Sequence, residues 1–230
     1  MASLVDSTRT IINGSHPFLK VFGLSFGIFA VLQIILSNAT EPQTKMIIAI
    51  ITILILFGYY IQAIHNSIND KAILIPRPYN LLYFLFNGLR GVISLLPYIA
   101  LVYYGMLWIN PLMTFDTWIN ITLQILAFTL LFSFFATGLL LHARNFSFIQ
   151  SYDFKKLIKY SGDIVVRNYT LLFGLAVLIG LIFVPVGIGI HLMFDYGPVF
   201  NFYVIFSAVF LLLIVSQYYA LLYFEYMDLD

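Results

Sequence analysis

The sequence contains very little charge. Only 9% of its 230 residues are Asp, Glu, Lys or Arg, whereas 62% are hydrophobic. A soluble domain carries about 25% charged residues, and a chain with far fewer cannot cover a surface that faces water. The composition therefore argues against a soluble protein and predicts that the lipid bilayer is the main solvent and partner of this chain.

Cysteine is also absent, which excludes disulfides, thiolate metal sites and cysteine nucleophiles. No long basic tract is present and the formal net charge is +1, so no nucleic-acid partner is predicted. The sequence has no HExxH pattern, no nucleophile elbow and no glycine-rich phosphate loop. We therefore predict no catalytic residue, no metal site and no cofactor.

Long apolar runs dominate what is present. A spanning helix needs about 20 mostly apolar residues at 1.5 Å per residue, and six runs qualify. None has Asp, Glu or Arg in its middle: Phe18–Ser37, Met46–Ile64, Val92–Ile109, Trp118–Leu141, Thr170–Met193 and Phe202–Tyr223. They predict an all-α integral membrane protein with six transmembrane helices in three hairpins. We favour an uncleaved first run over a signal peptide, because no compact basic region precedes it.

Basic residues lie almost entirely in alternate linkers. The linkers 37–45, 110–117 and 195–201 carry a single basic residue, Lys45. By the positive-inside rule, the other side is cytoplasmic and holds both termini, which predicts an inner-membrane protein. The remaining Lys and Arg all fall on that side: Arg9, Lys20, Lys71, Arg77, Arg90, Arg144, Lys155, Lys156, Lys159 and Arg167.

A cytoplasmic, interfacial amphipathic helix is predicted before each hairpin, over residues 4–13, 80–90 and 154–167. In the third, one face combines Phe154, Leu157, Ile158, Ser161 and Val165. Its opposite face is basic, which suits a helix lying against anionic headgroups. The candidate headgroup contacts are Lys155, Lys156, Lys159 and Arg167. The second helix is less polar, and its sequence fits burial against neighbouring spans as well as a position on the headgroups.

This order of elements suggests a threefold internal repeat within one membrane domain, residues 1–230. The units would be residues 1–70, 71–150 and 151–230, which are nearly equal in length. The alternative is that any chain of three hairpins shows this hydropathy.

Three ionisable residues, His65, His142 and Glu225, lie at the cytoplasmic ends of the second, fourth and sixth spans. If the units pack around a pseudo-threefold axis, the three side chains would converge into one polar cluster. The alternative is that each is solvated separately by the headgroups, because span ends already lie at that level.

Several residues within the spans predict local structure. Pro97 and Pro185 are candidate helix kinks, with Val184–Ile190 as the stretch expected to be irregular. Gly23 and Gly27 form a GxxxG pattern, which can support a close helix crossing. Ser133 and Thr137 are expected to bond to their own helix. Interfacial aromatic belts are predicted from Tyr59, Tyr60, Tyr103, Tyr104, Trp108, Trp118, Tyr218, Tyr219 and Tyr223.

The stretch from Gly58 to Leu89 resembles the family of prokaryotic membrane proteins named domain of unknown function 4013. The resemblance rests on Gly58-Tyr59, Asn66, Ile75-Pro76 and Leu85-Phe86-Asn87-Gly88-Leu89. This chain has a basic loop with Lys71 and Arg77 where the family has an acidic one. The resemblance implies a bacterial or archaeal inner membrane and hairpins with interfacial helices, and it implies no activity because the family is uncharacterised.

The leading functional hypothesis is a non-enzymatic structural or accessory subunit of a membrane protein complex. It follows from the lack of a catalytic pattern together with large apolar faces and short outer loops. The alternative is a small transporter or a lipid- or peptide-handling protein that uses the kink at Pro185 and the predicted polar cluster.

Overall fold

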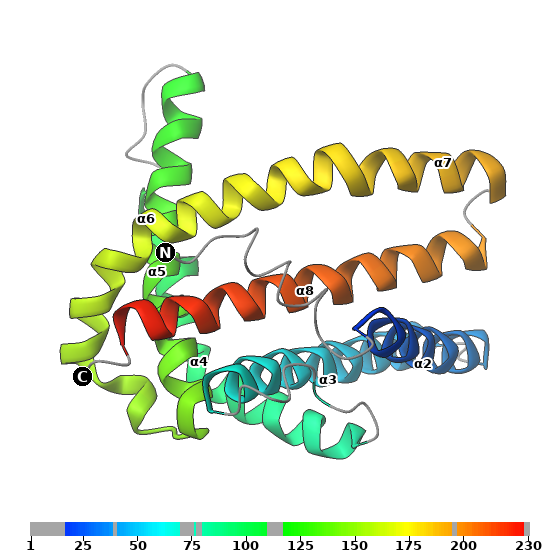
Figure 1. Cartoon of the computed structure of the whole chain (residues 1–230), viewed down its shortest axis with the longest axis horizontal. Coiled ribbons are helices and arrows are strands. Elements are labelled where there is room, and N and C mark those ends of the chain that lie inside the picture. Colours follow the sequence, from blue (N-terminus) through cyan, green and yellow to red (C-terminus); the bar gives the residue numbers. More distant parts are fainter. Residues whose placement is uncertain are drawn as a thin grey trace.

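The protein is built from helices, as the computed structural model shows (Figure 1). The structure describes residues 17–38, 41–69, 76, 80–109, 117–194 and 197–227. No strand occurs in these ranges, so the all-α prediction is confirmed for them. The predicted amphipathic helix over residues 4–13 lies outside the described residues.

The helices follow one another as three antiparallel pairs. The first pair is α2 (Pro17–Asn38) and α3 (Pro42–Asn69), and the second is α4 (Leu81–Ile109) and α5 (Thr117–Asn145). A short 3₁₀ helix, η2 (Gln150–Tyr152), leads into the third. The third pair is one interrupted helix followed by α8: α6 (Phe154–Leu178), the π-helical turn η3 (Ile179–Phe183), α7 (Val184–Phe194) and α8 (Pro198–Tyr226).

Five helices of the described part are long and apolar enough to cross a membrane: α3, α4, α5, the continuous α6–α7 and α8. The described apolar stretch of α2, Lys20–Gln33, is shorter. Helices of 28 or 29 residues, such as α3 and α4, are about 43 Å long, close to the full thickness of a bilayer with its headgroups. The chain is therefore a membrane-embedded, multi-pass helical protein.

Two segments predicted as separate interfacial helices are instead the first turns of spanning helices. Residues 81–90 open α4, and residues 154–167 open a helix that continues to Phe194. No proline or turn sequence separates either segment from the span that follows, so the helix continues without a break. α4 also runs without interruption past Pro97.

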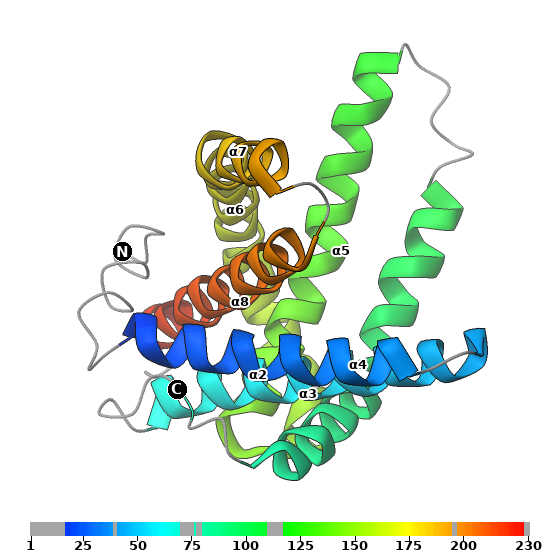
Figure 2. The same cartoon turned by 90° about the vertical axis from the view of Figure 1, so that its right-hand side faces the viewer.

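α3 lies at the centre of the packing and contacts α2, α4, α5 and α8. The helices do not form a simple parallel bundle. In Figures 1 and 2, α6–α7 and α8 run beside each other while α5 runs across their direction. Helices that cross in this way approach closely at few points, so the small residues at those points decide the packing.

The closest crossing joins α3 and α4 at Gly58 and Gly88. A Cβ atom on Gly58 would lie 1.8 Å from the carbonyl oxygen of Phe84, and one on Gly88 would lie 1.9 Å from that of Leu54. Only glycine allows two backbones this near. The first turns of α4 are thereby packed against the middle of α3, with Phe84 and Asn87 buried. This contact decides between the two positions that the sequence left open for the segment.

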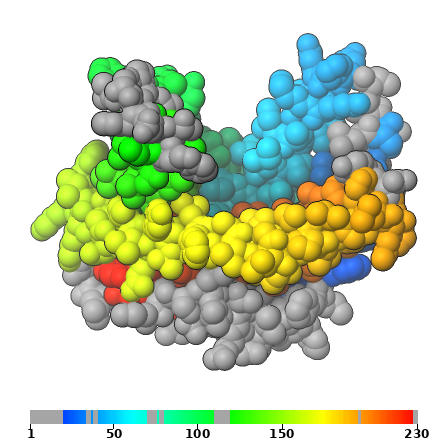
Figure 3. Space-filling model, turned by 90° about the horizontal axis from the view of Figure 1, so that it is seen from above, coloured from blue at the N-terminus to red at the C-terminus, as the bar shows by residue number. Residues whose placement is uncertain are grey.

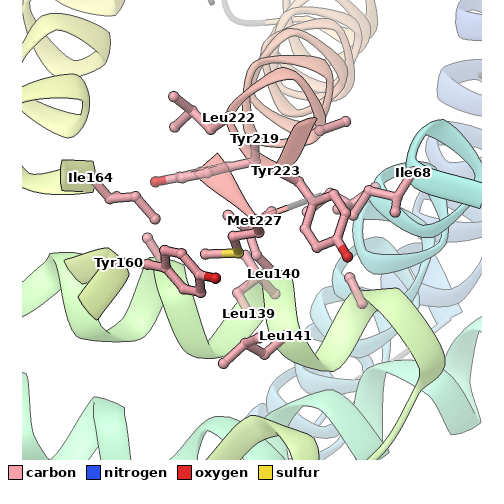
Figure 4. Close-up of a cluster of buried hydrophobic side chains, with 14 of the residues drawn as sticks. Ile68, Leu139, Leu140, Leu141, Tyr160, Ile164, Tyr219, Leu222, Tyr223 and Met227 are labelled. Atoms are coloured by element: carbon pink, nitrogen blue, oxygen red, sulfur yellow. The ribbon is translucent and has the colours of Figure 1, made fainter. Parts of the chain in front are cut away.

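The main core lies where the last turns of α3, α5 and α8 meet the first turns of α6, a region that we call the joint (Figure 4). It includes Ile68, Leu139, Leu140, Tyr160, Ile164, Tyr219, Leu222, Tyr223 and Met227. A second cluster joins α2, α3, α4 and α8 through residues such as Val21, Ala63, Phe84 and Ile214. The joint therefore holds the three helix pairs together.

The irregular stretch of the third pair is not where it was predicted. Val184–Phe194 is α-helical, and the irregular turn is η3, Ile179–Phe183, just before Pro185. A proline ring collides with the carbonyl group four residues earlier, here that of Leu181, so the helix adjusts on the N-terminal side. The hydroxyl of Tyr203 on α8 donates to the carbonyl oxygen of Phe183 at 2.5 Å and satisfies one backbone group of this turn.

Candidate functional site

The polar side chains of the joint form the best-defined candidate site. The last four carbonyl groups of a helix lack partners within the helix, and at the end of α5 they are met by side chains of α3. His65 donates from Nδ1 to the carbonyl oxygen of Ala143 at 2.8 Å. Asn69 donates from Nδ2 to that of Arg144 at 2.8 Å. α3 therefore caps α5 across the joint.

His142 is fully buried one turn before the end of α5. Its Nδ1 lies 3.3 Å from Oγ of Ser151, and that hydroxyl donates to the carbonyl oxygen of Ser147 at 3.0 Å. Nδ1 of His142 and Oγ of Ser151 are therefore within hydrogen-bond distance of each other. Nε2 of His142 has no hydrogen-bond partner among the described residues.

Phe146 lies between the two histidines. Its ring centroid is 4.6 Å from that of His65 and 6.1 Å from that of His142. Phe146 follows the last residue of α5 and has φ of 50°, a left-handed position normally taken by Gly or Asn. This conformation costs a larger residue about 1–2 kcal/mol. The contacts of the Phe146 ring with the two histidines offset that cost. His65 and His142 therefore share one aromatic neighbour in the joint.

Glu225, the third residue of the predicted cluster, is joined to α6. Its Oε1 accepts a hydrogen bond from Nη2 of Arg167 at 2.9 Å, and the two side chains are 24% and 21% exposed. Nε of Arg167 donates to the hydroxyl of Tyr226 at 3.1 Å. Arg167 had been predicted as a headgroup contact, and here it forms an ion pair that joins α6 to α8.

The other three predicted headgroup contacts lie on the first turns of α6. Lys155 and Lys159 are exposed, and Nζ of Lys159 lies 5.1 Å from the ring centroid of Tyr160. Lys156 is half-buried, and its backbone N–H donates to Oδ1 of Asp153, the N-cap of α6. The predicted apolar face is divided: Leu157 and Ser161 are buried against the rest of the chain, whereas Phe154 and Ile158 are exposed.

Tyrosines form most of the remaining links across the joint, which sequence reasoning missed. Tyr59, Tyr60, Tyr218, Tyr219 and Tyr223 were assigned to an interfacial belt, and all five are buried. The belt prediction was wrong for them because several of their hydroxyls find partners on other elements. Tyr218 donates to the carbonyl oxygen of Arg167 at 2.9 Å, and Tyr219 donates to Oδ1 of Asn168 at 3.0 Å.

A second pair of tyrosines fixes the turn after α5. The rings of Tyr98 and Tyr152 are stacked at 5.9 Å. Tyr98 donates to the carbonyl oxygen of Ser151, and Tyr152 donates to that of Ser94 at 2.8 Å. Burial raises the pKa of the Tyr152 hydroxyl above its ordinary value. The two bonds tie α4 to η2 in both directions.

Side-chain amides form hydrogen bonds between α3 and its neighbours α4 and α8. Oε1 of Gln62 accepts from the hydroxyl of Tyr83 at 3.0 Å and from Nδ2 of Asn87 at 3.4 Å, both on α4. Gln217 of α8 donates to Oγ of Ser67 at 2.6 Å. Such bonds are favourable in an apolar environment because an unpaired amide there is costly.

Within the spans, the expected local bonds are present. Ser133 donates to the carbonyl oxygen of Leu130 at 2.6 Å, and Thr137 donates to that of Ser133 at 2.8 Å. Both predictions of bonding within the same helix are confirmed. The outer aromatic residues Tyr103, Tyr104 and Trp108 are exposed, as a belt requires, and the side chain of Trp118 lies outside the described part.

An apolar groove of about 660 Å³ lies between α3, α4 and α5. A hollow between α5, in green, and α3, in cyan, is visible in Figure 3. Apolar and aromatic side chains line it, including Phe57, Val102, Phe128, Phe132 and Phe135. Such a surface can hold hydrocarbon, and Tyr103 is the one lining residue with a polar side-chain group.

Two further findings concern the possible chemistry of the chain. No group of three or more His, Asp or Glu side chains is placed to hold a metal ion in the described part of the chain. Searches against protein-family models, curated proteins and solved structures found no match. The functional argument therefore depends on the contacts within the chain.

Proposed function

We propose that this chain is a structural or accessory subunit of a membrane protein complex, without catalytic activity of its own. The observation that carries the proposal is the unequal covering of its helices. Half of the apolar stretch of α5 is buried within the chain, but only 11% of that of α6–α7 is buried. Large apolar side chains such as Leu181 and Leu192 are exposed along it. We assign this uncovered face to a partner subunit.

The use of polar groups at the joint supports a structural role. The side chains of His65, Asn69, Gln62 and Gln217 bond to other helices. The Ser151–His142 pair is fully buried, and its hydroxyl donates to Ser147, so it is not presented to a substrate. A nucleophile needs both access and a base that takes its proton.

The proposed setting is the inner membrane of a bacterium or archaeon, with six spans and both termini in the cytoplasm. α2 would supply the sixth span. The absence of cysteine gives a direct test. Single cysteines at Asn38, Asp116 and Lys156 are expected to react with an impermeant reagent from the outer side for the first two and from the cytoplasmic side for the third. Labelling of all three from one side would refute this topology.

Co-purification tests the accessory role. We expect the chain, solubilised from its native membrane in a mild detergent, to retain one or more partner subunits at fixed stoichiometry. The double variant Leu181→Ala/Leu192→Ala should lose them, because it removes exposed apolar contacts on α6–α7. Leu82→Ala/Phe86→Ala, which makes the same kind of change on the exposed face of α4, is the matched control and should retain them. A chain that always elutes alone would contradict the proposal.

The apolar groove favours a second candidate function, the handling of a lipid or an apolar peptide. A bulky residue at the groove should block that activity, so Val102→Trp is expected to abolish a transport or resistance phenotype. Leu101→Trp is the control, because Leu101 is the exposed neighbour outside the groove lining. An unchanged phenotype in Val102→Trp would contradict this alternative.

A further inference from the structure

The turn between α5 and α6 exposes several large apolar side chains. We call residues 146–158 the elbow. Four of its large apolar side chains are exposed: Ile149 by 83%, Phe154 by 71%, Ile158 by 70% and Phe148 by 48%. In Figure 3 the start of α6, in yellow-green, lies at the outer edge of the molecule. A group of large apolar side chains at one exposed turn marks a contact surface.

The first turns of α6 have three distinct sides. One is buried in the joint through Leu157, Tyr160 and Ile164. A second carries Phe154 and Ile158, which are both exposed. A third is charged and carries Lys155, Lys159 and Asp163. The apolar side of the elbow is thus limited to the first turns of α6, and the exposed Val166 and Phe173 of the span lie in line with Lys155 and Lys159.

The length of α6–α7 limits where the elbow can lie. Its 41 residues are about 61 Å long, whereas a bilayer with its headgroups is about 40–45 Å thick. An upright helix would carry the apolar stripe of the elbow far into water. Figure 1 shows that the first turns of α6 run at an angle to the rest of α6–α7, and this bend together with a tilt shortens the distance that the helix covers across the membrane. The bend and the tilt together place the elbow at headgroup level.

We propose that the elbow is a membrane anchor, in which Phe148, Ile149, Phe154 and Ile158 enter the boundary between headgroups and acyl chains while Lys155 and Lys159 bind anionic lipid phosphates. Apolar insertion and a basic side chain together make the two signals that hold a surface on an anionic leaflet. The lysines select anionic headgroups because each adds an attraction of about fivefold near such a surface. The anchor goes beyond the accessory role and does not depend on it.

Spin labels test the insertion, since the chain has no cysteine of its own. The full-length protein would be placed in nanodiscs of phosphatidylglycerol and phosphatidylcholine. Labels at Ile149→Cys and Ile158→Cys are expected to be more accessible to oxygen than to a water-soluble nickel chelate, like a label at the lipid-facing reference Leu96→Cys. The matched control Lys155→Cys, in the same turn but on the charged side, should show the reverse preference.

Each other outcome overturns the proposal. Labels at Ile149→Cys and Ile158→Cys that favour the nickel chelate would place the elbow in water. Labels accessible to neither reagent would mean that protein, such as a second copy of this chain, covers the elbow. Both variants replace exposed side chains, so helical content and elution volume serve as the check on folding.

A second measurement tests the headgroup preference. In detergent, native mass spectrometry of the protein titrated with phosphatidylglycerol or phosphatidylcholine gives the affinity of the first bound lipid. We expect tighter binding of phosphatidylglycerol, and a preference reduced by up to about 25-fold in Lys155→Gln/Lys159→Gln. Lys45→Gln, at the start of α3, should leave the preference unchanged. Equal binding of the two lipids by the unaltered protein would overturn the assignment of the lysines.

Discussion

Two glycine pairs in this protein have opposite surroundings. Gly58 and Gly88 face each other across α3 and α4, where an added Cβ atom would meet backbone within 2 Å. Gly23 and Gly27, which form the GxxxG pattern of α2, have nothing within 4 Å of an added Cβ atom. The spacing within one helix therefore did not reveal the close crossing. What matters is whether a second backbone lies opposite, and Gly58 and Gly88 belong to different helices.

The substitution Gly→Ala tests this comparison when it is made at glycines that have four different kinds of surroundings. The largest effect is expected at Gly58→Ala and Gly88→Ala. The new methyl group would overlap a carbonyl oxygen of the facing helix, and backbone cannot rotate away, so α3 and α4 must separate. We expect a loss of about 3 kcal/mol or more in the free energy of unfolding, measured by titration with dodecyl sulfate in mixed micelles. A loss below about 1 kcal/mol would show that the crossing is looser than described.

A smaller loss is expected at Gly138→Ala, where the methyl group would lie 2.7 Å from the ring of Tyr98. That ring is held by the bond from its hydroxyl to the carbonyl oxygen of Ser151, so it can shift only if the bond weakens. We expect a loss of about 1–3 kcal/mol. In a Tyr98→Phe background the same change should cost less, and the coupling energy of the double-mutant cycle measures the difference. Strict additivity would mean that the hydroxyl does not hold the ring.

Gly105→Ala is expected to change stability by less than about 1 kcal/mol. The nearest atom to the added methyl group is Cδ1 of Leu131 at 2.7 Å, the end of a flexible side chain that can take another rotamer. The gain in helix propensity from replacing glycine offsets the cost of that movement. The free energy of unfolding in mixed micelles is measured for Gly105→Ala and Gly138→Ala under the same conditions. An equal loss in the two variants would contradict the distinction between the fixed ring of Tyr98 and the mobile side chain of Leu131.

Gly23→Ala and Gly27→Ala should be neutral or slightly stabilising, by up to about 1 kcal/mol each, because alanine is the better helix former and nothing opposes it. This face borders a small apolar hollow of about 270 Å³ with Thr52, Ile55 and Leu81. The measurement is again unfolding of the isolated protein, together with its elution volume. A clear loss of stability or a change in oligomeric state would show that another helix covers this face.

Sequence patterns predicted the helical class and the membrane environment well, because both follow from composition and run length. They also predicted the backbone bonds of Ser133 and Thr137, which involve only residues of the same helix. The candidate site was predicted less well. His65 and His142 meet at Phe146, whereas Glu225 pairs with Arg167, and no periodicity distinguishes these partners. The threefold repeat stays a prediction.

The tyrosines show most clearly what cannot be predicted from sequence alone. Sequence alone places a tyrosine at the end of an apolar run but does not say whether its hydroxyl meets water or another helix. Tyr103 and Tyr104 are exposed on α4, whereas Tyr218 and Tyr219 are buried on α8 with partners on α6. Both pairs are adjacent tyrosines within an apolar run. Their surroundings differ because α8 is packed among other helices at the joint and the outer part of α4 is not.

By itself, the sequence determined that this is a helical membrane protein and roughly where its helices lie. Those properties depend on the transfer of each side chain between water and lipid, which is local and additive. Only the tertiary structure decided which glycines touch, that the histidines meet at Phe146, that Pro185 acts on the turn before it, and that the elbow is left exposed. These depend on distances between residues far apart in the chain, and the apolar runs of this protein are too alike to specify them one by one.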